Sequence, residues 1–276
     1  MIGKLGKGKA AFAKELGVSV SSLYYQRKLP DKDRALKIRI EEAWRYHPSY
    51  GHRRLALHLG INKKRIRRVM RLFGLHPYRR RGKTPKKSSR IKGSAYPNLV
   101  KDIVPQYAGH IWAADFTYLS YRKKFLYVAT VKDVFTRRIV GWAAMRSHST
   151  PLILQALFMA LSAHPRPEIF HSDNGSEYAS RVFVQVLTDT GITISRIVPG
   201  CPWENGYQES FYAQFKIDLG DPDRFASLGE LVYEIAKTIW YYNHSRIHTA
   251  IKMPPAIYAQ RHERKLVEFH SEKRGT

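Results

Sequence analysis

The order of apolar segments after residue 109 most constrains the fold of this chain. Residues 111–121, 125–134 and 137–144 are β-branched and aromatic segments with brief connections, the pattern of an antiparallel meander. Periodicity then predicts helices over 150–164, 176–190, 203–219 and 228–243, with strands over 168–172 and 192–198. Three adjacent strands followed by alternating helices and strands predict a mixed-sheet α/β domain.

Three carboxylates occupy distinctive positions in this predicted domain. Asp115 lies inside the first strand, where a carboxylate is costly unless it is paired or metal-bound. Asp173 lies in the turn Asp-Asn-Gly just after the fourth strand, and Glu209 lies in the predicted helix 203–219. If the first and fourth strands are neighbours, both aspartates converge at one edge of the sheet, and Glu209 approaches from its helix.

Such a carboxylate trio suits divalent metal chemistry. Two Mg²⁺ ions about 3.5–4 Å apart, on the attacking and leaving oxygens of a phosphodiester, need few protein carboxylates to hold them. Lys216 lies seven residues after Glu209 and on the same helix face, where it can hold a phosphate. The pattern therefore suggests phosphoryl transfer on nucleic acid.

The charge distribution indicates a polyanionic partner. The net charge is +26, and residues 1–95 hold 27 Lys or Arg against 5 Asp or Glu. We expect this front third to bind nucleic acid through its positive charge. A polybasic membrane anchor is the alternative. That alternative is less favoured because no lipidation motif and no long apolar run accompanies the charge.

Targeting signals and cysteine pairs are missing from the sequence. No secretory h-region and no run long enough for a spanning helix is found, so an intracellular location is expected. The single cysteine, Cys201, excludes an intrachain disulfide and a zinc site built on paired cysteines. His47, His52 and His58 are interpreted as surface or phosphate-contacting residues rather than metal ligands.

Two helical units precede the α/β domain. Residues 9–16 and 20–28 flank a Gly-containing turn and predict a helix-turn-helix, which Pro30 closes, and residues 31–46 form a connecting helix. A second unit begins at residue 49, where Asn62 caps a helix with a basic outer face. Residues 78–98 follow as a basic linker.

The predicted organisation has five parts. They are an N-terminal helix-turn-helix with its connecting helix (1–47), a second helix-turn-helix (48–77), a basic linker (78–108), a catalytic core (109–222) and a C-terminal helical extension (223–276). The predicted DNA-contacting residues are basic and lie mostly in the second unit and the linker. They are Arg53, Arg54, Lys63, Lys64, Arg65, Arg67, Arg68, Arg79, Arg80, Arg81, Lys216 and Arg246.

Five motifs in order resemble one family. They are Tyr50-Gly51-His52-Arg53-Arg54, the segments 112–118, 171–178 and 202–216, and Tyr242-Asn243-His244-Ser245-Arg246-Ile247-His248 with Pro254 and Tyr258. Together they resemble a DDE transposase of the retroviral-integrase superfamily. The resemblance is strongest to the downstream-frame protein of the insertion sequence 3 family, and it covers nearly the whole chain.

The resemblance implies a ribonuclease-H-like core and cleavage and joining of DNA ends. It implies two Mg²⁺ ions per site, with Mn²⁺ as a substitute, bound by Asp115, Asp173 and Glu209. It implies double-stranded DNA as element end and target, a homo-oligomer of at least two protomers on DNA, an upstream-frame protein or fusion as a further partner, and a place at the bacterial nucleoid. A catalytically inactive DNA-binding regulator and a nuclease on the same fold are the alternatives.

Overall fold

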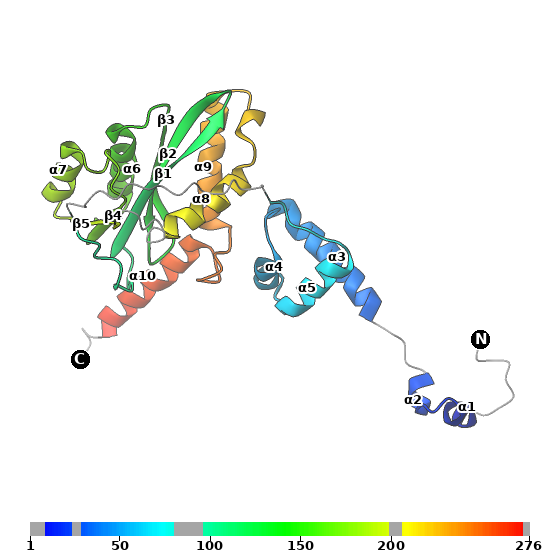
Figure 1. The fold of residues 1–276 in the computed structure, drawn as a ribbon. Coiled ribbons are helices and arrows are strands. Elements are labelled where there is room, and N and C mark those ends of the chain that lie inside the picture. Colours follow the sequence, from blue (N-terminus) through cyan, green and yellow to red (C-terminus); the bar gives the residue numbers. More distant parts are fainter. Residues whose placement is uncertain (1–8, 24–28, 80–95, 199–205, 273–276) are drawn as a thin grey trace.

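The computed structural model describes residues 9–23, 29–79, 96–198 and 206–272. Figure 1 shows an α/β body joined to a smaller helical unit, with α1 and α2 further out along the chain. The helices before the sheet are α1 (Lys9–Glu15), α2 (Val20–Leu23), α3 (Leu29–Tyr46), α4 (His52–Leu59) and α5 (Lys63–Leu72). The body comprises β1 (Ile111–Tyr121), β2 (Lys124–Asp133), β3 (Ile139–Met145), α6 (Thr150–Ala163), β4 (Ile169–Ser172), α7 (Arg181–Asp189), β5 (Thr193–Arg196), α8 (Gly206–Leu219), the 3-10 helix η3 (Pro222–Arg224), α9 (Leu228–His244) and α10 (Pro255–Glu272).

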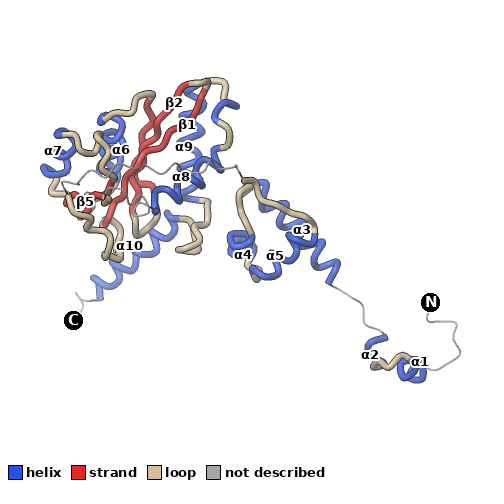
Figure 2. Tube along the Cα trace, viewed as in Figure 1, coloured by secondary structure: helices blue, strands red, loops and turns tan. Residues whose placement is uncertain are grey.

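The five strands form one mixed sheet in the order β3-β2-β1-β4-β5. β1 pairs with β2, and β2 with β3, in antiparallel fashion, whereas β4 is parallel to both β1 and β5. Figure 2 shows this sheet between two sets of helices. The predicted meander and the predicted mixed five-stranded sheet are confirmed, with β1 and β4 as neighbours.

The alternation of side chains along the strands divides the core in two. Trp112 and Ala114 of β1 pack with α6 and α7, whereas Leu119 and Tyr121 of the same strand pack with α8 and α9. Side chains at successive strand positions face opposite sides of a sheet. Asp115 therefore shares its face with Leu119 and Tyr121, which is the face that α8 covers.

Several helix boundaries differ from the sequence predictions. α7 begins at Arg181 rather than 176, because the Ser180 side chain accepts a hydrogen bond from the Phe183 amide and caps the helix there. Ser149 rather than Thr150 is the N-cap of α6. Pro30 does not close the first unit but lies in the first turn of α3, where its missing N–H costs nothing. Residues 24–28 and 203–205, which complete two predicted helices, lie outside the described residues.

The helices α3, α4 and α5 share one hydrophobic core, which includes Leu36 and Ile40 of α3, Leu55 of α4, and Ile66 and Val69 of α5. Asn62 caps α5 as predicted, because its side chain accepts a hydrogen bond from the Lys64 amide at 2.8 Å. Packing thus groups α3 with the second unit, and it groups α9 with the sheet. The five-part division of the chain remains a prediction. No helix in the described ranges has the length and apolar character needed to cross a bilayer.

Gly141 of β3 provides a test of how closely α6 packs on the sheet. A Cβ atom at this position would lie 2.2 Å from the Ala156 carbonyl oxygen and 2.8 Å from the Ala160 Cβ of α6. We predict that Gly141→Ala lowers the free energy of unfolding by about 2–3 kcal/mol, since neither backbone can yield without strain. Denaturant titration measures this loss.

Gly229→Ala is the matched control for this substitution. The added Cβ there would come no closer than 3.8 Å to the Ser227 hydroxyl oxygen, and the position is helical. Its free energy of unfolding should stay within about 1 kcal/mol of the parent value. An equal loss in both variants would contradict the packing described here.

Candidate active site

The pairing of β1 with β4 sets the two aspartates at one level of the sheet. The parallel ladder ends with Ala113 opposite His171, and Asp115 and Asp173 each lie two residues beyond that pair. Asp115 is only partly buried, and its Oδ1 accepts a hydrogen bond from the Phe116 amide at 2.8 Å. The two carboxylates thus follow the same point of the sheet, as predicted from strand adjacency.

A tight turn fixes the side chain of Asp173. Its Oδ1 accepts a hydrogen bond from the Gly175 amide at 2.9 Å, and the Asn174 side chain donates to the Ile197 carbonyl oxygen at 2.6 Å. A Cβ on Gly175 would lie 3.0 Å from Asp173 Oδ1 and 3.0 Å from Glu177 Oε2. Glycine therefore leaves room for two carboxylates at this turn.

Glu209 is an exposed residue in the first turn of α8 as the structure describes it. Its neighbour Gln208 is fully buried and donates from Nε2 to the Ala113 carbonyl oxygen at 2.5 Å. One turn further, the Tyr212 hydroxyl donates to the Asp115 carbonyl oxygen at 2.6 Å. These two bonds fix the start of α8 against the strand that carries Asp115.

The carboxylates of Asp173 and Glu209 both interact electrostatically with that of Asp115. Burial, together with the charges of Asp173 and Glu209, raises the pKa of Asp115 from 3.8 to about 7. Burial also raises the pKa of Asp173, and nearby Glu177 adds to this rise. The Lys216 ammonium opposes the rise at Asp115 and lies 5.2 Å from the Tyr118 ring centroid. Unrelieved negative charge is what a bound cation neutralises.

Arg196 of β5 supports the turn around Asp173. It is 2% exposed, and its guanidinium donates to the Ser172 hydroxyl and to the Tyr178 carbonyl oxygen. Its charge lowers the pKa of Asp173 against the effect of burial. On the other side of the turn, His148 Nδ1 lies 2.9 Å from Glu177 Oε1. A buried cation and a histidine–carboxylate pair thus flank the second aspartate.

The described residues do not by themselves form a complete metal cage. No group of three His, Cys, Asp or Glu side chains within those ranges is close enough to hold one ion. The donor chemistry nevertheless fits a divalent cation, because three carboxylates interact through their charges without enough positive charge to balance them. Glu209 stands three residues after the start of α8, next to the undescribed segment 199–205.

The predicted DNA contacts of α5 divide into two groups. Lys63, Lys64 and Arg67 are exposed, as are Arg53 on α4 and Arg79 beyond α5. Arg68 is also exposed but pairs with the buried Asp33 of α3 at 2.5 Å, and the partly buried Arg65 donates to the Lys32 carbonyl oxygen at 3.4 Å. Arg80 and Arg81 lie outside the described residues.

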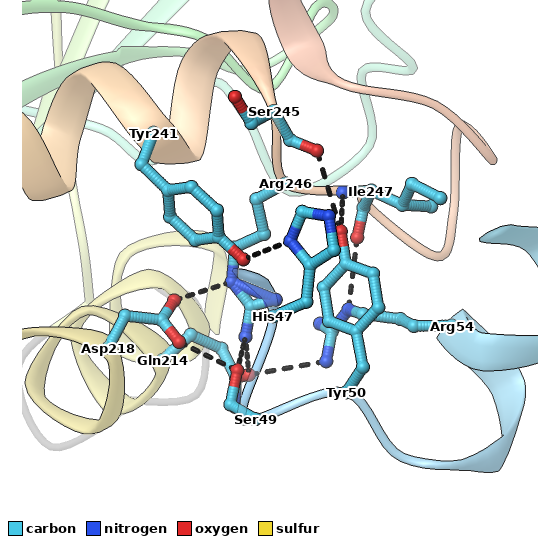
Figure 3. Close-up of polar contacts among 10 residues, drawn as sticks. All are labelled: His47, Ser49, Tyr50, Arg54, Gln214, Asp218, Tyr241, Ser245, Arg246 and Ile247. Atoms are coloured by element: carbon cyan, nitrogen blue, oxygen red, sulfur yellow. Dashed lines mark hydrogen bonds and ion pairs between the residues drawn. The ribbon is translucent and has the colours of Figure 1, made fainter. Parts of the chain in front are cut away.

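Arg54 and Arg246 belong to a polar joint between the helical unit and the sheet domain (Figure 3). Arg246 is 2% exposed, and its Nε lies 2.7 Å from Asp218 Oδ2 of α8. Arg54 of α4 donates to the Ile247 carbonyl oxygen at 3.0 Å and to Gln214 Oε1 at 3.3 Å. The Arg246 guanidinium is therefore buried within the joint and paired with Asp218 rather than displayed on an open surface, and its contact with DNA stays a prediction.

The histidine and tyrosine of the front unit complete this joint. His47 stacks on Tyr50 with ring centroids 4.3 Å apart, and its Nδ1 lies 2.7 Å from the Tyr241 hydroxyl of α9. Burial, with the charges of His58 and Arg246, lowers the pKa of His47 to about 4. His47 is therefore a partly buried, neutral residue that contacts Tyr50 and Tyr241, which corrects its interpretation as a surface or phosphate-contacting residue.

The chain is similar in sequence to known families and proteins. Residues 105–202 match one integrase core domain family, and residues 190–255 match a second of the same description. The chain is 31% identical over 273 residues to the transposase for insertion sequence element IS629 of Shigella sonnei, covering 92% of each protein. This chain belongs to the insertion sequence 3 family of transposases, within the retroviral-integrase superfamily.

Other proteins are similar to part of this chain. It is 33% identical over 194 residues to the transposase for element IS904 of Lactococcus lactis, covering 69% of this chain and 77% of that protein. The HTLV-2 integrase catalytic core domain, solved in complex with magnesium, is 19% identical, with a TM-score of 0.47 over 55% of this chain and 97% of that one.

Sequence reasoning missed most residues that position the carboxylates. Gln208, Arg196 and His148 are isolated polar residues in the sequence, and no local pattern distinguishes them from surface positions. Tyr212 lies three residues after Glu209 and therefore on the same helix face, and this spacing was the one available signal. Their roles arise from contacts between elements distant in sequence.

The raised pKa of Asp115 predicts a stability change with pH. In the unfolded chain Asp115 ionises near pH 4, whereas in the folded, metal-free protein it resists ionisation up to about pH 7. The penalty is absent below pH 4, grows from pH 4 to 7 and is complete above that, at about 1.4 kcal/mol for each pKa unit. Asp115→Asn should therefore raise the free energy of unfolding at pH 8 but not at pH 4.

Denaturant titrations in EDTA at both pH values measure this difference. Asp102→Asn, which changes an exposed aspartate ahead of β1, is the matched control and should show no such pH-dependent gain. An Asp115→Asn variant that is no more stable than the parent protein at pH 8 would contradict the electrostatic coupling described here.

Proposed function

We propose that this chain is a divalent-metal-dependent DDE transposase that cleaves the ends of a mobile DNA element and joins them to target DNA. The observation that carries the proposal is the parallel pairing of β1 with β4, which sets Asp115 and Asp173 at one level of the sheet, and the charges of Asp173 and Glu209 both act on Asp115 there. Family membership supports DNA strand transfer as the reaction class. The alternatives of an inactive regulator and of a nuclease that cuts without joining are less favoured.

Asp115, Asp173 and Glu209 would hold two Mg²⁺ ions, with Mn²⁺ as a substitute. When bound, such ions activate the attacking oxygen and stabilise the leaving oxygen of a phosphodiester. The protein's own residues prepare this site: Arg196 and the Gly175 amide orient Asp173, while Gln208 and Tyr212 fix α8 beside Asp115.

Lys216 would bind a DNA phosphate next to Asp115, whose pKa already responds to its charge. The exposed bases Lys63, Lys64 and Arg67 of α5 would contact duplex DNA away from the site, with Arg53 and Arg79 beside them. We further propose that at least two protomers act together on element-end and target DNA at the bacterial nucleoid, with an upstream-frame protein or fusion as a further partner.

Removing any one of the three carboxylates should abolish chemistry but spare binding. Asp115→Asn, Asp173→Asn and Glu209→Gln each remove a proposed metal ligand, so cleavage and strand transfer of labelled element-end DNA should fall at least 1,000-fold, or about 4 kcal/mol of barrier. DNA affinity should change little. Asp102→Asn is the control, and a triad variant that kept activity would remove that residue from the proposed ligand set.

The exposed face of α5 should dominate the salt dependence of DNA binding. Changing Lys63, Lys64, Arg67 and Arg71 to Gln removes four exposed cations, and the slope of log K against log salt should flatten by about 0.9 for each lost phosphate contact. Fluorescence anisotropy with duplex DNA measures the slope. The control changes exposed Lys101, Lys123, Lys252 and Arg261 to Gln, with equal charge loss. Equal slopes in the two variants would refute the assignment.

A further inference from the structure

A small cavity lies inside the joint between the helical unit and the sheet domain. Its volume is about 80 Å³. A cavity needs roughly 10–15 Å³ to hold one water molecule, so this one has room for several, the size of a phosphate group rather than a nucleotide. Its described lining is Arg54, Lys132, Ser210, Phe211, Gln214, Tyr242, Arg246, Ile247, His248 and Thr249.

Four basic side chains converge on this space, and no Asp or Glu is among its described lining residues. They come from three segments: Arg54 from α4, Lys132 from β2, and both Arg246 and His248 from the loop after α9. Asp218 does not line the cavity, but its carboxylate partly offsets the positive charge, because its Oδ2 lies 2.7 Å from Arg246 Nε. The cavity therefore has an excess of positive charge.

The pKa values of three of these side chains are lowered by their surroundings. Burial and the charge of Arg137 lower the pKa of Lys132 to about 7. Burial and the charge of Arg246 lower the pKa of Arg54 to about 10. Burial, with Lys132 and three arginines, lowers the pKa of His248 to about 3. Burial first, and neighbouring positive charge second, thus disfavour the charged forms of these three side chains, a condition that an anion would relieve.

Two polar atoms at the cavity lack protein partners. Arg246 uses Nε for Asp218 and Nη2 for Ser49 and Gln214, yet its Nη1 has no hydrogen-bond partner among the described residues, and the residue is only 2% exposed. Within the same ranges His248 Nδ1 is buried without a partner. Buried polar groups are ordinarily satisfied, so each atom points to a missing ligand.

We propose that this cavity is a binding site for one phosphate-sized oxyanion, held by Arg54, Arg246, Lys132 and His248. Two guanidinium groups and an ammonium match the charge and oxygen geometry of a phosphate. The phosphate is either a backbone phosphate of bound DNA or free inorganic phosphate. None of the three proposed catalytic carboxylates lines this cavity, so anion binding there does not require them.

Occupancy of this site fastens the two domains together. Arg54 belongs to the helical unit, whereas Ser210 and Gln214, on the opposite wall, belong to α8, the helix that carries Glu209. An anion between them offsets the repulsion between the Arg54 and Arg246 guanidinium groups. Binding therefore stabilises the position of α8 relative to the front unit.

Thermal unfolding of the full chain tests the site. Inorganic phosphate, compared with chloride at equal ionic strength, should raise the Tm in a saturable way. Lys132→Met removes one cation and leaves a side chain that fits between Phe211 and Tyr242, whose ring centroids lie 5.8 Å and 5.9 Å from the Lys132 ammonium. This variant should need at least tenfold more phosphate for the same rise.

Lys124→Met, an exposed lysine on the same strand, is the control and should respond like the parent protein. His248→Gln, which keeps polarity and size near the same cavity, provides a second variant if Lys132→Met does not fold, and it too should weaken the response. A phosphate effect that does not saturate, or that is equal in the cavity and control variants, would overturn the proposal.

Anisotropy with duplex DNA at fixed ionic strength separates the two sources of phosphate. If a DNA phosphate fills the site, inorganic phosphate weakens DNA binding and Lys132→Met flattens the salt slope by about one contact. If free phosphate fills the site, added phosphate leaves the DNA affinity unchanged, while the saturable rise in Tm persists.

Discussion

The parallel pairing of β1 with β4 is the constraint on which the rest of the site depends. Only this adjacency brings a residue in the middle of one strand to the same level as a residue in the turn after another. Because side chains alternate along β1, the same pairing also decides which face Asp115 uses, and that face is the one covered by α8. A shift of one residue in the register would turn Asp115 toward α6 and separate it from Glu209.

The helix α8 connects the sheet to the front of the molecule. Near its start, Gln208 and Tyr212 bond to backbone carbonyl oxygens of β1. Near its end, Gln214 and Asp218 bind arginines of the polar joint, including Arg54 from the helical unit. One rigid element thus contacts both the proposed catalytic strand and the domain expected to hold DNA, so a movement of the helical unit would be transmitted toward Glu209.

Basic residues of this chain serve two physically different purposes. The exposed lysines and arginines of α5 keep their hydration and remain available to a polyanion, whereas Arg246 and Arg196 are buried and bonded to protein oxygens. A buried arginine is tolerated where its donors find acceptors, and it then fixes the geometry of what surrounds it. Net charge alone therefore overstates the surface that this transposase offers to nucleic acid.

The sequence by itself determined the fold class and the order of the helices and strands along the chain, because hydrophobic periodicity and turn residues are local signals. It also selected Asp115, Asp173 and Glu209 as the candidate metal ligands. It also determined the cap at Asn62 and the basic face of α5 for the same reason. Only the tertiary structure decided that Arg246 is buried, that His47 contacts Tyr241, and that Gln208 and Arg196 bond to the backbone around the proposed site. Those roles depend on which distant segments meet, and burial changes the properties of a side chain in ways that its neighbours in sequence do not record.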